Sequence, residues 1–200
     1  MNWQAKNRNY KIKTEFKLGK RLIGEECPTY FIADIAANHD GDIKRAQELI
    51  YLAAEAGADA AKFQHFKAET IVSDNGFKDL GLQKSHQAKW GKSVFEVYKD
   101  ASLNSDWTPV LKETCEKAEI DFFTSPYSIE LVDSVDPYVC AYKIGSGDIT
   151  WIEIIEYMAK KAKPVLIATG ASTFDEVTHA MQAILKFNSL AEEDSIIRQV

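Results

Sequence analysis

Long apolar runs are missing from this sequence. No window holds the roughly eighteen consecutive apolar residues that a membrane-spanning helix requires. The N-terminal residues, MNWQAKNRNYKIK, are polar and basic and lack the apolar segment of a secretory signal peptide. We therefore expect neither secretion nor a membrane partner.

Basic charge and cysteine are also scarce. Lysine and arginine number 24 against 30 aspartates and glutamates, a formal net charge of −6, which argues against a nucleic-acid partner. The three cysteines, Cys27, Cys115 and Cys140, are widely spaced, and the four histidines form no H-x-x-x-H pair. An odd cysteine count without metal spacing favours the reducing cytoplasm and buried thiols, and no metal site can be completed from local spacing.

What the sequence does contain is an alternation of strand-like and helix-like segments. The first helix is expected to be capped by Asp42 and closed by Gly57, and the second to be capped by Ser105. A loop-rich insertion is expected from His65 to about Gly91. The full expectation is a hairpin at Thr14–Gly24, strands at Tyr30–Ala36, Asp59–Gln64, Ile120–Ser125, Tyr138–Ile144, Pro164–Thr169 and Ser195–Val200, and helices at Asp42–Ala58, Ser105–Glu119, Ser128–Val135, Ile149–Ala162 and Thr173–Phe187.

This alternation indicates parallel strands covered by helices, as in a doubly wound sheet or a (β/α)8 barrel. No G-x-G-x-x-G follows the first strand, which disfavours a dinucleotide-binding sheet. Short helix–strand links and polar strand–helix loops favour the barrel. We therefore predict an α/β fold, a parallel (β/α)8 TIM barrel truncated after about five βα units, with an N-terminal arm and β-hairpin over residues 1–28 and the barrel portion over 29–200.

Ligands of parallel α/β folds bind at the carboxyl ends of the strands, and two of these ends carry a lysine. Lys62 lies in DAAKFQHF and Lys143 in CAYKIGSGDIT. Two lysines among hydroxyls and glycine-containing turns predict a site for phosphate or carboxylate, hence a small anionic substrate. The other candidates at strand ends are Asp34, Asn38, His39, Asp40, Gln64, His65, Thr124, Ser125, Tyr127, Ser146, Asp148, Thr169, Gly170 and Ser172.

Each signal also has a structural explanation. A lysine at a strand end is commonly a solvated boundary residue. The NHDG segment is typical of a turn before the Asp42 cap, and Gly145 and Gly147 would permit a tight turn. Asp34 is harder to explain structurally, because a carboxylate within an apolar strand is costly unless it is paired.

Six motifs, in this order and spacing, resemble the sialic acid (N-acetylneuraminate) synthase family, including pseudaminic and legionaminic acid synthases. They are EFKLGKRLIG, FIADIAANHDGD, AGADAAKFQ, FFTSPYS, YKIGSGD and KPVLIATGAST, and they cover most of the chain. The resemblance implies a transferase of carbohydrate biosynthesis. It would condense phosphoenolpyruvate with an N-acetylated amino sugar of the N-acetylmannosamine type, giving a nine-carbon 2-keto acid and phosphate.

The resemblance also implies roles for individual residues. Asp34 and Asp148 stand where the family usually has glutamate, and Ala168 where many members carry serine. A divalent metal, Mn²⁺ or Mg²⁺, would be held by histidines beyond residue 200, and the full-length protein would be a homodimer. The implied catalytic residues are Asp34, Asp148, Lys62 and Lys143, and the implied substrate-binding residues are Asn38, His39, Gln64, Ser125 and Ser146.

Two other readings stay open at this point. One is a Schiff-base aldolase of the same barrel class, with Lys62 or Lys143 as the nucleophile. The other is a non-catalytic half-barrel that serves binding or assembly, since an incomplete barrel would expose strand edges.

Overall fold

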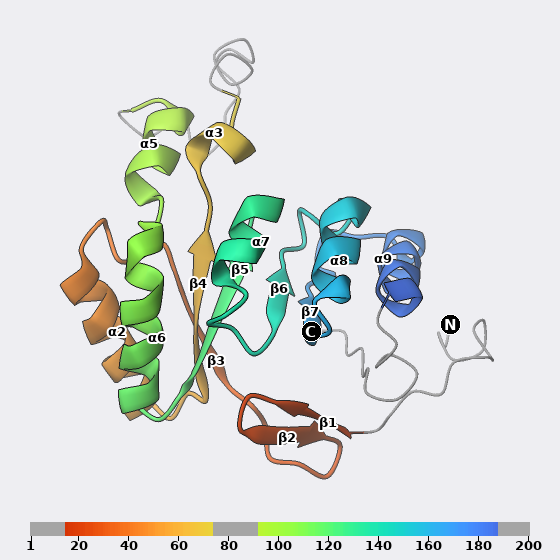
Figure 1. The fold of residues 1–200 in the computed structure, drawn as a ribbon, viewed down its shortest axis with the longest axis horizontal. Helices are drawn as coiled ribbons and strands as arrows, with labels where there is room; N and C mark the ends of the chain where they lie inside the picture. The colour runs from red at the N-terminus through yellow and green to blue at the C-terminus, as the bar shows by residue number, and fades with distance from the viewer. Residues whose placement is uncertain (1–14, 74–91, 188–200) are drawn as a thin grey trace. The chain divides into compact units, whose positions relative to one another are not determined.

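A computed structural model of the chain describes residues 15–73 and 92–187 (Figure 1). These residues fall into two compact units. One contains the residues up to Tyr30 together with those from Cys140 onward, and the other is Phe31–Val139. The strand expected at Ser195–Val200 and most of the expected loop-rich insertion lie outside the described residues.

Three of the described strands lie side by side in the Phe31–Val139 unit. They are β3 (Ile32–Ala36), β4 (Ala60–His65) and β5 (Asp121–Pro126). β4 pairs in parallel with both neighbours, which confirms the prediction of a parallel sheet in an α/β fold. Helices α2 (Ile43–Glu55) and α6 (Thr108–Lys117) pack against each other and against these strands (Figure 1).

The two faces of β4 differ in what covers them. Thr108 of α6 bonds to the ring of His65, so His65 points toward the helices. Because side chains alternate along a strand, Phe63 points the same way, and its ring lies 5.8 Å from that of Phe122. Lys62 and Gln64 therefore lie on the opposite face, where both are half-buried.

Helix α2 has the ends that the sequence predicts. The Asp42 side chain accepts a hydrogen bond from the Lys44 backbone at 2.8 Å. Gly57 adopts a φ of +86°, and its N–H bonds to the Ala54 carbonyl, while the Ala58 N–H bonds to the Ala53 carbonyl. This pair of bonds is a Schellman motif, which ends a helix at a glycine, so both predicted ends are confirmed.

The cap predicted for the second helix is wrong. Asn104, not Ser105, supplies the capping oxygen, which accepts from the Asp106 N–H at 3.0 Å. Ser105 is instead the first residue of a 3₁₀ helix, η2 (Ser105–Trp107), that leads directly into α6. Asparagine competes well with serine for this position, because its carbonyl reaches the same backbone N–H groups.

Two of the described helices in this unit were not predicted. α3 (Ala68–Ile71) is a single turn, and α5 (Val94–Ala101) begins with a capping box in which Ser93 and Glu96 bond to each other's backbone N–H. The S-x-x-E pattern before an apolar residue was the available signal for α5. The predicted helix α7 (Ile129–Val135) is confirmed, with Ser128 as its cap.

The other unit contains a hairpin and a second α/β portion. Strands β1 (Glu15–Leu18) and β2 (Arg21–Gly24) pair antiparallel, as predicted. Strands β6 (Tyr142–Ile144) and β7 (Val165–Ile167) pair in parallel and are shorter than predicted. Helices α8 (Ile152–Lys160) and α9 (Phe174–Phe187) pack on each other through buried Ile and Met side chains. Among the described helices, none is both long and apolar enough to cross a membrane.

Candidate functional site

An ion pair joins the first two strands of the Phe31–Val139 unit. Asp34 and Lys62 are register partners on β3 and β4, and the Asp34 Oδ1 lies 2.7 Å from the Lys62 Nζ. The lysine side chain is 12% exposed and the aspartate side chain 60% exposed. Asp34 is mostly exposed, so the cost expected of an unpaired carboxylate in an apolar strand is small here, and the pair holds a largely buried ammonium on the face of β4 opposite His65.

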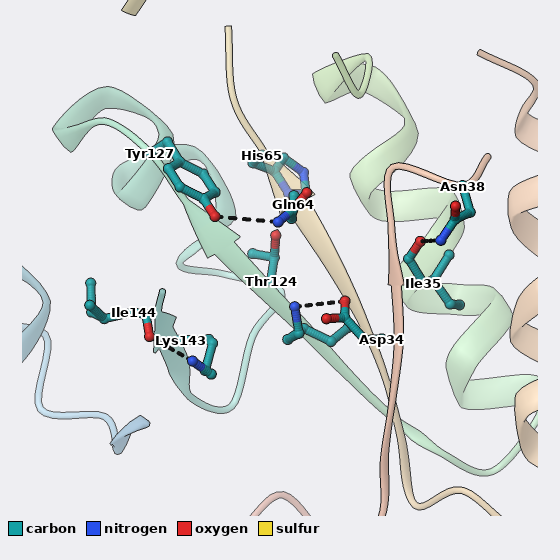
Figure 2. A network of polar contacts seen from close by, with 10 residues as sticks. Asp34, Ile35, Asn38, Gln64, His65, Thr124, Tyr127, Lys143 and Ile144 are labelled. Atoms are coloured by element: carbon teal, nitrogen blue, oxygen red, sulfur yellow. Dashed lines mark hydrogen bonds and ion pairs between the residues drawn. The ribbon is translucent and has the colours of Figure 1, made fainter. Parts of the chain in front are cut away.

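Two more predicted residues lie on the same face. Gln64 is the register partner of Ser125 on β5, and Ser125 is 4% exposed. The Gln64 Nε2 donates a hydrogen bond to the Tyr127 hydroxyl at 3.3 Å (Figure 2). The parallel register therefore brings together a cation, an amide and a hydroxyl beside the Asp34 carboxylate.

The loop between β3 and α2 has an unusual backbone. Ala36 and Asp40 adopt φ values of 51° and 49°, which are uncommon for residues other than glycine and cluster at functional sites. The Asn38 side chain donates to the Ile35 carbonyl at 2.9 Å (Figure 2), and the Asn38 carbonyl accepts from the Arg45 Nε at 2.7 Å. Asn38 itself is exposed, so its amide can meet a ligand.

His39 supports this loop from within. Its side chain is fully buried, its Nδ1 accepts from the Gly41 N–H at 3.1 Å, and its ring meets that of Trp107 edge-on at 5.8 Å. Burial lowers the pKa of His39, opposed by the charge of Asp40. The Nε2 has no hydrogen-bond partner among the described residues. The contact with Trp107 was not predicted, and no local pattern in the sequence signals it.

His65 was a strand-end candidate that the structure places elsewhere. It lies on the helix-covered face, with its Nδ1 2.6 Å from the Thr124 hydroxyl and its Nε2 2.8 Å from the Thr108 hydroxyl. Burial, reinforced by the nearby His39, lowers the pKa of His65 to about 4. His65 and Thr124 are thus a neutral, hydrogen-bonded part of the core.

The second predicted lysine belongs to the other unit. The Lys143 Nζ, at the end of β6, donates to the Ile144 carbonyl at 2.6 Å (Figure 2). The turn that follows carries Ser146, which is half-buried, and closes when the Asp148 N–H bonds to the Gly145 carbonyl at 3.1 Å. Burial raises the pKa of the Asp148 carboxyl, and Lys143 partly offsets this. Asp148 is therefore suited to hold a proton.

The backbone conformation of the turn after β6 does not require glycine at positions 145 and 147. Neither Gly145 nor Gly147 has a positive φ, and a Cβ built on Gly147 meets nothing within 4 Å. The expected tight turn is present, but it does not require a left-handed conformation at either glycine. Open space beside Gly147 is compatible with close approach of a ligand to the backbone.

The remaining candidates divide into inert and unexplained groups. Burial raises the pKa of Cys115 to about 12, so it stays a thiol and is no nucleophile, as expected. After β7, the Ser172 Oγ is buried without a hydrogen-bond partner in the described part of the chain. Within those same residues, no three His, Cys, Asp or Glu side chains are grouped so that they could hold a metal ion.

Comparison with known proteins gives a consistent set of similarities. Residues 49–198 match the sequence model of the NeuB family. The chain is 31% identical over 172 residues to the spore coat polysaccharide biosynthesis protein SpsE of Bacillus subtilis, covering 84% of the chain and 44% of that protein. It is 31% identical over 177 residues to the N,N'-diacetyllegionaminic acid synthase of Legionella pneumophila, covering 87% and 49%. It is 30% identical over 174 residues to human N-acetylneuraminate-9-phosphate synthase, covering 84% and 46%.

The chain spans about half the length of the curated relatives it matches. Among solved structures, it resembles the N-acetylneuraminic acid synthetase of Leptospira borgpetersenii in complex with citrate, with a TM-score of 0.73 and 27% identity over 93% of the chain and 58% of that protein. A truncated 3-deoxy-D-arabino-heptulosonate 7-phosphate synthase of Thermotoga maritima shares the fold, with a TM-score of 0.60 at 15% identity over 88% of the chain and 53% of that protein.

Proposed function

Because the chain belongs to the NeuB family, we propose that its protein joins phosphoenolpyruvate to an N-acylated amino sugar of the N-acetylmannosamine type. The products are a nine-carbon 2-keto acid, like sialic acid, and phosphate. One observation carries the proposal. The Lys62 ammonium, largely buried and paired with Asp34, lies on one sheet face with Gln64 and Ser125 in register beside it. A cation surrounded by such donors suits an anionic substrate.

In the proposed reaction, C3 of phosphoenolpyruvate forms a bond to the aldehyde carbon of the open-chain sugar, and the aldehyde oxygen takes up a proton. The oxygen of a water molecule adds to C2. The bond between C2 and the phosphate oxygen then breaks and the C2 hydroxyl gives up its proton to the departing phosphate, which leaves the keto group. Carboxyl groups that hold or accept protons serve both the water and the aldehyde oxygen.

The roles that we propose follow from the geometry of each residue. Lys62 binds an anionic oxygen of phosphoenolpyruvate, for which it exchanges its contact with Asp34. Ser125 donates its hydroxyl to the same anion. The exposed carboxylate of Asp34 accepts a proton from the attacking water. Gln64 binds the sugar.

Other assignments rest on the sequence motifs. Asn38 and His39 belong to the proposed substrate loop, and Asn38 is the exposed member. For Lys143, Ser146 and Asp148, the support is the resemblance of the YKIGSGD motif, together with the raised pKa of Asp148. Asp148 is the proposed proton donor.

Several features remain predictions. They are closure of the strands into a (β/α)8 barrel, division into an arm over 1–28 and a barrel portion over 29–200, a homodimer, and a cytoplasmic location. The divalent metal implied by the resemblance would polarise the aldehyde when bound. The described residues contain no group of three His, Cys, Asp or Glu side chains that could hold this metal. Its proposed ligands are histidines beyond residue 200.

A Schiff-base aldolase is the competing enzyme, and the ion pair argues against it. A nucleophilic lysine must be free to reach a carbonyl carbon, but the Lys62 Nζ is held by the Asp34 carboxylate at 2.7 Å. Borohydride reduction in the presence of pyruvate or phosphoenolpyruvate separates the two chemistries. The synthase forms no imine, so we expect no covalent adduct on Lys62 or Lys143, and a trapped adduct would support the aldolase.

Binding and turnover in the full-length protein test the proposal. We expect phosphate release from phosphoenolpyruvate only when an N-acylated amino sugar is present, and we expect calorimetry to detect phosphoenolpyruvate binding. Lys62→Ala and Lys143→Ala should each abolish that binding. The control is Lys92→Ala, since Lys92 is 63% exposed and paired with Asp100 of α5. A protein that folds but neither binds phosphoenolpyruvate nor releases phosphate would favour the non-catalytic reading.

A further inference from the structure

The side-chain amide of Gln64 makes one hydrogen bond within the described residues. Its Nε2 donates to the Tyr127 hydroxyl at 3.3 Å (Figure 2). A glutamine amide has two N–H donors and one acceptor oxygen, and a bond at the nitrogen fixes the direction of the oxygen. The orientation of Gln64 on the substrate face therefore depends on where Tyr127 places its hydroxyl.

Tyr127 is held at two points. Its backbone N–H donates to the His65 carbonyl at 2.9 Å, directly beyond the ends of β4 and β5. Its ring meets Phe66 edge-on at 6.2 Å, and Phe66, which is 5% exposed, packs in turn on Tyr98 at 5.6 Å. A ring fixed by its backbone and by a buried neighbour leaves the hydroxyl little freedom, so Tyr127 is a firm anchor for the amide.

The face that carries Lys62 and Gln64 offers both a charged donor and a neutral acceptor to a ligand. Lys62 can only donate hydrogen bonds, and it suits an anionic oxygen. The Gln64 Oε1 is a neutral acceptor on the same face. An anion at Lys62 and an N–H or O–H donor at Gln64 would therefore lie side by side there.

We infer that Tyr127 is a positioning residue, whose hydroxyl holds the Gln64 amide so that the Oε1 accepts a hydrogen bond from the acylamino N–H or a hydroxyl of the amino sugar. This inference rests on the proposed function and adds a determinant of sugar binding to it. Tyr127 acts through Gln64, and phosphoenolpyruvate binding does not depend on it.

Tyr127→Phe tests the inference in the full-length protein, because it removes one oxygen and keeps the ring on Phe66. We expect the KM for the amino sugar to rise about two- to tenfold, the effect of one hydrogen bond. The KM for phosphoenolpyruvate should stay within about twofold of the wild-type value. Tyr98→Phe is the matched control, since it removes the same oxygen from the other ring that packs on Phe66. An unchanged sugar KM, or equal effects of the two substitutions, would overturn the inference.

A double-substitution cycle separates positioning from packing. In a Gln64→Ala background, Tyr127→Phe should have no further effect on the sugar KM, because the amide through which it acts is gone. Additive effects would contradict the inference.

A spectroscopic measurement keeps the inference testable if the proposed function fails. The side-chain amide resonance of Gln64, identified in glutamine-labelled protein by its loss in Gln64→Ala, should shift in Tyr127→Phe and stay in place in Tyr98→Phe. A resonance unmoved by Tyr127→Phe rejects the anchor itself. A shifted resonance without any synthase activity would reject the proposed function and, with it, the sugar as the ligand of Gln64.

Discussion

Asp34 and Lys62 form an asymmetric ion pair, in which the lysine side chain is 12% exposed and the aspartate side chain 60% exposed, 2.7 Å apart. Water can solvate the aspartate without its partner, but it reaches little of the lysine. Breaking the pair therefore leaves Lys62 with a poorly solvated charge, whereas Asp34 is solvated with or without its partner.

We expect Asp34→Asn to lower the free energy of unfolding by about 1 kcal/mol, because the lysine charge stays largely buried while the aspartate was mostly solvated. Urea denaturation measures this change. Asp100→Asn is the control, since the pair of Asp100 with Lys92 is exposed on both sides. It should change stability much less than Asp34→Asn does, and an equal loss in both variants would contradict the asymmetry.

The same Asp34→Asn variant separates binding from turnover. Asp34 competes with an incoming anion for the Lys62 ammonium, so its neutralisation should leave phosphoenolpyruvate affinity equal or higher. Phosphate release should fall at least about a hundredfold, because the proposed proton acceptor is lost. Calorimetry and a phosphate assay measure the two effects. Loss of binding together with turnover would show that Asp34 is needed to place Lys62 and would remove the argument for a catalytic role.

The buried His65 should make stability depend on pH. Its pKa falls from 6.5 to about 4 on folding, so the unfolded chain binds more protons between these values. Stability is then fully present above about pH 6.5 and declines as the pH falls toward 4, by on the order of 3 kcal/mol. His39, whose pKa burial also lowers, contributes in the same direction. Urea denaturation at a series of pH values measures this decline.

His65→Gln should flatten that decline and lower stability at neutral pH. It disrupts the bonds to the Thr124 and Thr108 hydroxyls, which we expect to cost about 2–4 kcal/mol. His179→Gln is the control, since His179 is exposed on α9. If the pH dependence of His65→Gln equals that of the wild type, the decline belongs to other groups.

Asp148 should change stability with pH in the direction opposite to His65, because burial raises its pKa. Burial raises its pKa above the ordinary 3.8, so the folded protein binds more protons than the unfolded chain as the pH rises through that range. Its contribution to stability is therefore greatest at low pH and is lost as the pH rises through the folded-state pKa. Asp148→Asn removes this loss, so the variant should gain stability relative to the wild type from about pH 4 upward.

Lys143 provides a second test of Asp148, because its charge lowers the pKa of that carboxyl. In a Lys143→Ala background, the stability gained from Asp148→Asn at neutral pH should be larger. Denaturation curves of the four proteins, at about pH 3 and pH 7, measure both effects. An unchanged gain would show that Lys143 does not act on Asp148.

Two glycine substitutions should have opposite effects on stability and binding. Gly57→Ala forces a side chain into a φ of +86° and should cost about 1–2 kcal/mol, without affecting phosphoenolpyruvate binding. Gly147→Ala meets open space at an ordinary φ and should change stability by less than about 0.5 kcal/mol. If an anion approaches the turn after β6, Gly147→Ala should nevertheless weaken binding at least about fivefold. Unchanged binding would place the anion away from this turn.

The sequence determined the features that depend on neighbours along the chain. Apolar periodicity gave the alternation of helices and strands, and local hydrogen bonding gave the Asp42 cap and the Gly57 stop. These are decided within a few residues, so a pattern can reveal them. The order of the motifs along the chain identified the family, because it is a property of the sequence that does not depend on knowing the fold.

Only the tertiary structure decided which strand-end residues share a face. The run AAKFQH does not say which of its two faces meets the helices, and both Gln64 and His65 are polar. The choice is made by partners far along the chain. Thr108 lies 43 residues beyond His65, and Tyr127 lies 63 residues beyond Gln64. Parallel register and helix packing, which no local periodicity encodes, turn His65 into the core and leave Gln64 beside Lys62 on the face proposed for the substrate.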